Sequence, residues 1–383
     1  MTEVLHIVKK LQVPSTRLQR KTKFQAPRWS SSASFKFGVW SFSGAGSLVF
    51  GALAGIFVTG CAVHPRTPAI TAAASASQVW PPPPEVARIS YVQTILRPAD
   101  IGMKFSAFTR LGHWITGSEK GNERLLKPFG LALDENDNIC LTDTGANAVC
   151  YYDRAKKKWH RWTRIGDVHL TSPVAVAKRG GTFFVADSAS GRVIAFKEDA
   201  KILFQVTNHL GRPSGVAILN DRLFVADSQR HTIVVFNLRG DFQREFGRRG
   251  IGHAEFNFPT HLAVDGQRNL LVTDSMNARV QVLDADGIYK GEIGNIGDSP
   301  GHFARPKGAA VDSFGNVYVL DALFDNLQIF DHSGRLLLNF GETGGQPGQF
   351  WLANGIAITR ENEILVADSY NHRIQVFKYV GPM

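Results

Sequence analysis

The 383-residue sequence predicts an all-β fold, a six-bladed β-propeller closed by an N-terminal strand and preceded by a signal segment and a Pro/Ala/Ser-rich tether. Three observations predict it. An apolar strand, an Asp, a small polar turn and a second apolar strand recur six times, with 40 to 47 residues between successive Asp residues. Apolar residues alternate with period 2 around each Asp, and many glycines lie at recurring turn positions. Repeats of this length built from short strands are typical of propeller blades.

The positive charge of the chain is concentrated in its first 60 residues. The formal net charge is +10, but residues 1–60 hold eight Lys or Arg and one acid, Glu3, which leaves only +3 for the remainder. A nearly neutral body argues against a nucleic-acid-binding surface. The basic residues are instead typical of a targeting segment.

An apolar segment follows this basic lead. Ser47–Val58 is a run of apolar and small residues, and it leads into Val58-Thr59-Gly60-Cys61. These four residues resemble the bacterial lipobox, which implies that Cys61 is acylated and becomes the first residue of the mature protein. The alternative is an uncleaved transmembrane anchor, since about 20 apolar residues span a bilayer.

The predicted domain organisation has three parts. Residues 1–60 are a signal or targeting segment, 61–87 a flexible tether rich in Ala, Ser, Thr and Pro, and 88–383 the propeller. Resemblance to Gram-negative lipoproteins with Ala after the Cys implies an outer-membrane lipoprotein that faces the periplasm.

Each repeat predicts the same series of strands. A Pro opens five of the six, a Gly-Val-Ala-like strand follows, and the strands on either side of the Asp come next. The last repeat ends without a fourth strand, whereas Arg88–Leu96 forms a spare strand before the first repeat. Pairing this segment with Arg373–Lys378 closes the ring and removes an unpaired edge.

The last repeat, ILVADSYNHRIQVF, is similar to the NHL-repeat family, as are the Gly-rich segments 294–303 and 341–350. The resemblance covers roughly residues 88–380 and implies a six-bladed propeller. It says little about activity, because the family includes scaffolds, RNA- and protein-binding modules and some enzymes.

The recurring acids are predicted to be structural. They occur once in every repeat, at Asp143, Asp187, Asp227, Asp274, Asp321 and Asp368. Catalysis or metal binding rarely needs the same residue in every blade, whereas a hairpin turn does, because an Asp accepts backbone N–H groups of its own turn. Arg192, Arg279 and Arg373, five residues after their Asp, are candidate partners.

One repeat departs from the others near the predicted central channel. Two residues after the position of the opening Pro, five repeats have Gly or Ala, whereas the fourth repeat has His261. Lys307 and Asn354 occupy the neighbouring position in the next two repeats, so the three residues are candidates for binding at the channel or its mouth. The alternative is a hydrogen-bonded His that fills the channel.

The main rival to a binding role is a metal enzyme. Amidating lyases of the same superfamily hold zinc through several His, and lactonases of the regucalcin type need a Glu ligand. This chain offers one His at the matched position and no matching Glu, whereas a zinc site needs three converging protein ligands. No cofactor, metal ligand or catalytic residue is therefore predicted.

Two further features carry open alternatives. Cys140 and Cys150 flank the first Asp and are either a cross-strand disulfide or two buried thiols. The long segment 103–127 has apolar residues at helical spacing, which suggests a helix over the mouth that acts as a plug or binds a partner.

These features favour an envelope-anchored, non-catalytic propeller scaffold that binds a protein or another macromolecule, with the membrane reached through Cys61 and no role for nucleic acid. The alternative is a metal-dependent hydrolase or lyase, lactonase-like or amidating-lyase-like, with its site in the central channel.

Overall fold

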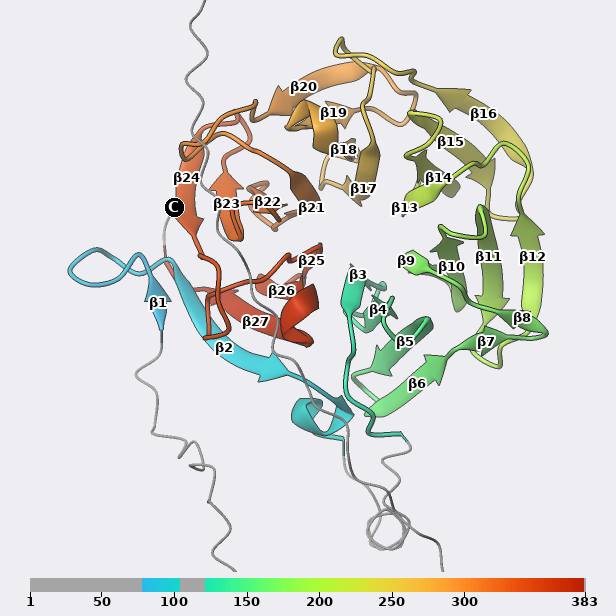
Figure 1. The fold of residues 1–383 in the computed structure, drawn as a ribbon, viewed down its shortest axis with the longest axis horizontal. Helices are drawn as coiled ribbons and strands as arrows, with labels where there is room; N and C mark the ends of the chain where they lie inside the picture. The colour runs from blue at the N-terminus through green and yellow to red at the C-terminus, as the bar shows by residue number, and fades with distance from the viewer. Residues whose placement is uncertain (1–77, 104–120, 382–383) are drawn as a thin grey trace, which may run out of the picture. The chain divides into compact units, whose positions relative to one another are not determined.

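Six antiparallel sheets are arranged as the blades of a ring in the computed structural model, which describes residues 78–103 and 121–381 (Figure 1). The signal segment, Cys61, residues 61–77 of the tether and residues 104–120 of the long loop lie outside these ranges. Within the described part, no helix has both the length and the apolar character needed to cross a membrane.

The first five blades follow the chain, each with its first strand at the centre of the ring and its fourth at the periphery (Figure 1). Blade 1 consists of β3 Pro128–Leu133, β4 Ile139–Asp143, β5 Ala148–Asp153 and β6 Lys158–Trp162. Blade 2 consists of β9 Pro173–Arg179, β10 Thr182–Asp187, β11 Arg192–Lys197 and β12 Ile202–Val206. Blade 3 consists of β13 Pro213–Leu219, β14 Arg222–Asp227, β15 Thr232–Asn237 and β16 Phe242–Phe246. Blade 4 consists of β17 Pro259–Val264, β18 Leu270–Asp274, β19 Arg279–Leu283 and β20 Tyr289–Ile293, and blade 5 of β21 Pro306–Val311, β22 Val317–Asp321, β23 Asn326–Phe330 and β24 Leu336–Phe340.

Blade 6 joins the two ends of the propeller. Its strands are β25 Gly355–Ile358, β26 Glu363–Asp368, β27 Arg373–Tyr379, β2 Ile89–Ile95 and β1 Val79–Trp80. Ile89 pairs with Tyr379 and Ile95 with Ile374, so the closing strand predicted from the sequence is confirmed.

The folded part of the chain begins within the range predicted as tether. Val79 and Trp80 pair with β2, and the Trp80 ring stacks on Phe340 with 4.9 Å between ring centroids. The same ring covers Gly348, where an added Cβ would lie 2.1 Å from it. A side chain at position 348 would therefore displace Trp80 from the blade.

Short elements complete the described chain. They are the two-stranded hairpin of β7 Arg164–Ile165 and β8 Val168–His169, and the 3₁₀ turns η1 Pro98–Ile101, η2 Ser275–Asn277 and η3 Ser369–Asn371.

The apolar core lies between neighbouring blades, in six clusters of buried side chains among the described residues. Strand β10 shows why the inner strands are apolar on both faces. Phe183 belongs to the cluster shared with blade 1, and the next residue, Phe184, belongs to the cluster shared with blade 3. Successive side chains of a strand point to opposite faces, so every blade contributes to two cores.

Candidate functional site

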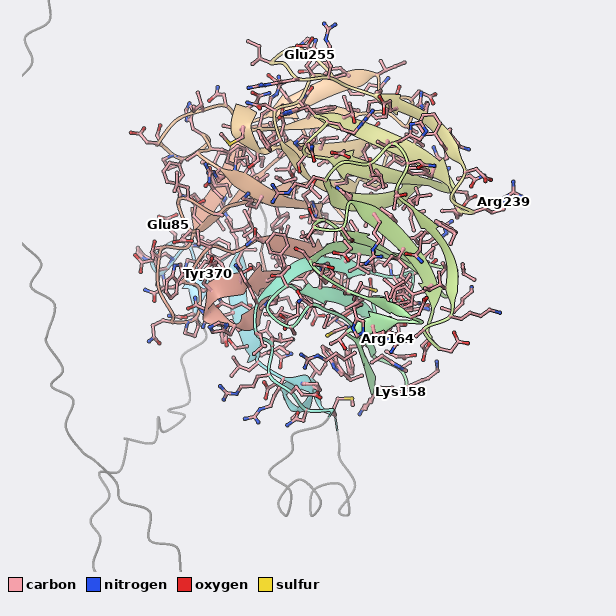
Figure 2. All side chains as sticks on the ribbon, turned by 45° about the vertical axis from the view of Figure 1, so that its right-hand side comes forward. Glu85, Lys158, Arg164, Arg239, Glu255 and Tyr370 are labelled. Atoms are coloured by element: carbon pink, nitrogen blue, oxygen red, sulfur yellow. The ribbon has the colours of Figure 1, made fainter. Side chains whose placement is uncertain are left out.

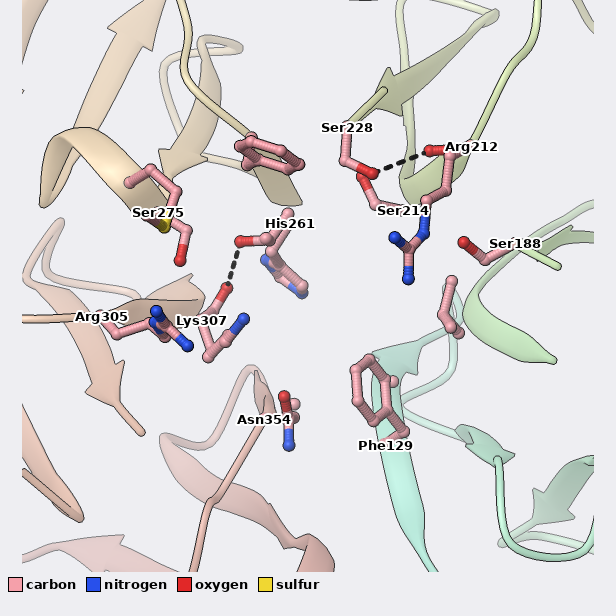
Figure 3. A pocket seen from close by; sticks show the side chains of 16 residues that line it. Phe129, Ser188, Arg212, Ser214, Ser228, His261, Ser275, Arg305, Lys307 and Asn354 are labelled. Carbon is pink, nitrogen blue, oxygen red and sulfur yellow. Dashed lines mark hydrogen bonds between the residues drawn. The ribbon is translucent and has the colours of Figure 1, made fainter. Parts of the chain in front are cut away.

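A cavity of about 360 Å³ lies at the centre of the ring, on the face where the first strand of each blade begins (Figure 3). We call it the mouth cavity. The residue that follows the opening position of each blade contributes to its wall, and these six residues differ in chemistry: Phe129, Val174, Ser214, Thr260, Lys307 and Asn354. The regular repeat therefore presents an irregular set of side chains to one central space.

Three cations line the mouth cavity: Arg212 of blade 3 and Arg305 and Lys307 of blade 5. Within the described part of the chain, no hydrogen bond or ion pair is formed by the Arg212 guanidinium, the Arg305 guanidinium or the Lys307 ammonium. No Asp or Glu lies among the residues that line the cavity. Figure 3 shows the Arg212 and Lys307 side chains directed into the cavity, with Arg305 beside Lys307. Burial lowers the pKa of Lys307, the charges of Arg305 and Arg212 lower it further, and the charge of Asp321 opposes the shift.

Hydroxyl groups form much of the remaining polar wall, from Ser188, Ser214, Ser228, Thr260 and Ser275. Some of them fix the backbone of the ring. Ser214 Oγ donates to Pro259 O at 2.7 Å and so links blade 3 to blade 4, and Ser228 Oγ donates to Arg212 O at 3.1 Å. The second bond holds the loop that presents Arg212.

His261 lies where the mouth cavity meets a second cavity of about 270 Å³ further down the channel. Its Nδ1 accepts the Ala309 N–H at 3.4 Å, which leaves the ring proton on Nε2 in the neutral form. Burial lowers the pKa of His261 to about 4, so the ring is neutral at physiological pH. These contacts fit a hydrogen-bonded side chain that narrows the channel.

The structure brings His261, Lys307 and Asn354 to one cavity, with different surroundings for each. The Asn354 amide donates to Leu352 O at 2.8 Å and to Ser369 Oγ at 3.0 Å, so it stabilises its own loop. Of the three residues, Lys307 alone points an unpaired charge at the cavity. Their role in binding stays a prediction.

Arg212 and Arg305 were not among the residues selected from the sequence. Each directly precedes the Pro that opens its blade, and the corresponding positions in the other four blades hold Lys127, Ser172, Phe258 and Leu352. The variation at this position was the available signal, because a residue needed only for the turn would be alike in every repeat.

Large apolar side chains are exposed on the same face as the mouth cavity. We call this set the apolar rim: Leu126, Phe258, Met276, Leu323, Trp351 and Tyr370, with exposed fractions from 40% to 62%. Phe258 and Met276 also line the cavity. Trp351 and Tyr370 lie 5.6 Å apart, and the Lys127 ammonium lies 4.3 Å from the Tyr370 ring centroid. Exposed apolar residues therefore continue outward from the cavity wall.

The six repeated Asp residues are buried and form the turns of the blades. Asp368 accepts the Trp351 N–H at 2.8 Å and Arg373 Nε at 2.7 Å. Arg192 and Arg279 make the corresponding ion pairs with Asp187 and Asp274. Each Asp also accepts a backbone N–H from the segment that leads into its blade, a contact that the hairpin pattern alone did not reveal.

The candidate disulfide between Cys140 and Cys150 is not present, and both residues are buried free cysteines. Cys140 pairs with Tyr151, and Cys150 pairs with Leu141. Of the two alternatives left open by the sequence, the structure therefore has two buried thiols. The hairpin register differs by one residue from the one that would set Cys140 opposite Cys150, and the two thiols lie on opposite faces of the blade. Cys140 packs toward blade 2 and Cys150 toward blade 6.

The mouth cavity does not fit a metal ion. His261 provides the single imidazole of its wall, and none of the lining residues has a carboxylate or thiol. Elsewhere in residues 78–103 and 121–381, no group of three or more His, Cys, Asp or Glu side chains is arranged to hold one. Three converging cations favour an anion instead.

Sequence and structure comparisons agree with this architecture. Residues 350–377 match the NHL repeat family, and residues 204–271 match a family described as a 6-bladed beta-propeller. A search of curated proteins found no match.

Solved structures with the same fold have varied activities. The chain is similar to a protein of unknown function from Bacteroides thetaiotaomicron, with 16% identity and a TM-score of 0.53 over 66% of this chain and 70% of that one. It is similar to an auxiliary nutrient binding protein from the same bacterium, with 11% identity and a TM-score of 0.53 over 67% and 69%. It is also similar to virginiamycin B lyase from Staphylococcus aureus, with 13% identity and a TM-score of 0.50 over 67% and 96%. At such identities the likeness shows the fold alone. Together, the six blades and the family matches show that the chain is a six-bladed β-propeller with an NHL repeat at residues 350–377.

Proposed function

We propose that this protein is a non-catalytic scaffold of the cell envelope that binds a partner protein on the face surrounding the mouth cavity. The observation that carries the proposal is the apolar rim, which leaves Trp, Tyr, Phe, Met and Leu side chains exposed around one opening. Contiguous exposed apolar residues mark protein–protein contact sites, and Trp, Tyr and Met are enriched in such interfaces. These side chains lie in the loops and turns next to the strands of the ring.

The test is capture of the partner from native envelopes after chemical cross-linking. Joint replacement Leu323→Ser and Trp351→Ala removes the two most exposed aliphatic and aromatic members of the rim, at 62% and 50% exposure. We expect recovery of the cross-linked partner to fall at least tenfold, as for central interface residues. The matched control is Leu203→Ser, because Leu203 is similarly exposed, at 46%, on the outer strand β12. Equal recovery from both variants would overturn the proposal.

The envelope location is part of the proposal and rests on residues 1–61. The basic lead, the apolar run Ser47–Val58 and the four residues ending at Cys61 support lipid attachment. Mass spectrometry of the mature protein should find no peptides from residues 1–60 and an acyl mass on Cys61. Intact basic N-terminal peptides in the membrane fraction would contradict the lipid anchor and favour an uncleaved one.

Measuring the metal content and the partner binding of the purified protein distinguishes a scaffold from a metal enzyme. We expect Lys307→Gln to weaken partner binding and His261→Ala to leave the metal content unchanged. Stoichiometric zinc or calcium that is lost from His261→Ala would overturn the scaffold proposal, because His261 is the cavity residue best suited to ligate such an ion.

A further inference from the structure

The cations of the mouth cavity differ from the buried Arg residues of the blades in lacking a carboxylate partner. Arg279 donates to Asp274 at 3.1 Å and to Glu292 at 2.8 Å. Arg373 donates to Asp368 and to three backbone carbonyls. Arg212, Arg305 and Lys307 have no such partners within the described part of the chain, although they share one cavity.

Placing like charges together in a partly buried cavity is unfavourable. Burial is the largest cause of the lowered pKa of Lys307, the charges of Arg305 and Arg212 add to it, and the charge of Asp321 opposes it. An anion in the cavity would reverse both effects by supplying opposite charge and hydrogen-bond acceptors. Guanidinium groups also present paired N–H donors that match the two oxygens of a carboxylate.

The walls of the cavity add an apolar requirement. Phe129, Phe258 and Met276 line it beside the cations, and the last two belong to the apolar rim. A small inorganic anion would leave these side chains exposed to water. A carboxylate followed by a large apolar side chain would use both parts of the wall, and about 360 Å³ accommodates side chains but no folded domain.

We propose that the mouth cavity binds an acidic peptide segment of the partner protein, with a carboxylate among Arg212, Arg305 and Lys307 and an adjacent large apolar side chain against Phe129, Phe258 and Met276. This inference rests on the proposed function and specifies the chemistry of the partner.

A displayed library of random heptapeptides, selected on the purified full chain, tests the inference. We expect the enriched peptides to place Asp or Glu next to Phe, Leu, Ile or Trp. Synthetic copies of the enriched peptide, with its acids retained or changed to amides, then measure affinity by fluorescence anisotropy. We expect the change to amides to weaken binding at least tenfold, and added salt to weaken the acidic peptide alone.

Variants of the protein assign the effect to the cavity. Arg212→Gln, Arg305→Gln and Lys307→Gln should each weaken the acidic peptide about tenfold, as expected for a charged hydrogen-bonded contact. Arg239→Gln is the control for loss of a positive charge elsewhere, because the Arg239 side chain is 86% exposed and projects from the outer edge of the ring (Figure 2). Its affinity should equal that of the unmodified protein.

Two results would overturn the inference in distinguishable ways. Enriched peptides without an acidic preference, bound through Trp351 and Leu323 but not through the cations, would refute the anion site and retain the protein-binding function. Failure to enrich any peptide, together with pyrophosphate binding that depends on the same three cations, would refute both and assign the cavity to a small anion.

Discussion

The Asp turns and the mouth cavity are built from the same repeats and treat charge in opposite ways. In the turns, the same residue occurs in every blade, and its carboxylate is saturated with donors. Asp274 and Asp368, for example, each accept bonds from a backbone N–H, an Asn, an Arg and a Gln. In the mouth cavity, the equivalent positions differ from blade to blade, and three cations have no acidic partner.

This difference separates the two tasks of a repeat protein. Positions that are alike in every blade support the ring, because every blade must make the same turn and pack against the next blade. Positions that vary while facing one shared space need not make the same contact in every blade. Some still support the ring, as Ser214 does, whereas others, such as Lys307, can serve a ligand. A buried, paired charge and an unpaired charge should therefore respond oppositely to removal.

The largest expected effect is at a paired position. Asp368→Ala leaves the Arg373 guanidinium, which is 8% exposed, without its carboxylate. We expect the free energy of unfolding to fall by about 3–5 kcal/mol, as for other broken buried ion pairs. Urea denaturation measures it, with Asp298→Ala as control because Asp298 is exposed. A loss below about 1 kcal/mol would show that the turn does not depend on its Asp.

The closing strands belong to the same supporting frame. Trp80→Ala removes ring contacts with Phe340 and Phe377, at 4.9 Å and 5.7 Å between centroids. Because Trp80 is only partly buried, we expect a loss of about 2 kcal/mol, below the roughly 3–5 kcal/mol typical of Phe→Ala or Trp→Ala in a protein core. Thermal unfolding checks this loss. An unchanged melting temperature would mean that β1 adds nothing to blade 6.

His261 lines the mouth cavity but is partly buried in the propeller. Its titration tests whether the side chain supports the fold or faces the water in the cavity. Its pKa is lowered to about 4 in the folded protein, against about 6.5 in the unfolded chain. Above pH 6.5 the imidazole ring is neutral in both states, and the free energy of unfolding does not depend on its protonation. As the pH falls toward 4, the unfolded chain binds a proton that the ring in the folded protein does not, so the free energy of unfolding decreases. We expect a decrease of about 3 kcal/mol across that window, at about 1.4 kcal/mol for each unit of pKa shift, measured by urea unfolding at stepped pH. His261→Gln should lack it, whereas an identical pH profile would place the ring in water.

The smallest effect on stability is expected where the charges are unpaired. Lys307→Gln removes an ammonium whose pKa is lowered by burial and by Arg305 and Arg212. Its removal should leave the free energy of unfolding unchanged or raise it by about 0.5 kcal/mol, in the way that functional sites often reduce stability. Between the lowered pKa and about 10.5 the unmodified protein should also gain stability with rising pH, and the variant should not. A clear decrease in the free energy of unfolding would show that Lys307 supports the fold, as the Asp turns do.

Much of the fold was predictable because it rests on local signals repeated six times. The Asp spacing gave the number of blades, and the missing fourth strand of the last repeat identified β2 as its replacement. The register of one hairpin was not predictable to a single residue. Asp143 pairs with Ala148, one position away from the symmetric arrangement that would have placed Cys140 beside Cys150.

The site was predictable only in part, because its residues come from separate blades. His261, Lys307 and Asn354 were found as departures from a Gly or Ala pattern or as their neighbours, and all three line the cavity. Arg212 and Arg305 were missed, because the sequence does not show that the residues before these two Pro residues lie in the same cavity. They are brought together only when the ring places blade 3 and blade 5 around one opening. The convergence of three cations on a cavity wall without Asp or Glu is a property of the assembled ring that no single repeat contains.

The pairing of β2 with β27 also sets the order of events while the chain is being made. Ile89, fully buried in the finished ring, pairs with Tyr379 near the other end of the described chain. At the usual rate of about 5–20 residues per second, a ribosome needs roughly 15 to 60 s to travel between them. During that interval β2 has its edge and its apolar face unpaired, a state prone to aggregation. Blade 6 can therefore close only after β27 has been made, although β2 is made before every strand of blades 1 to 5.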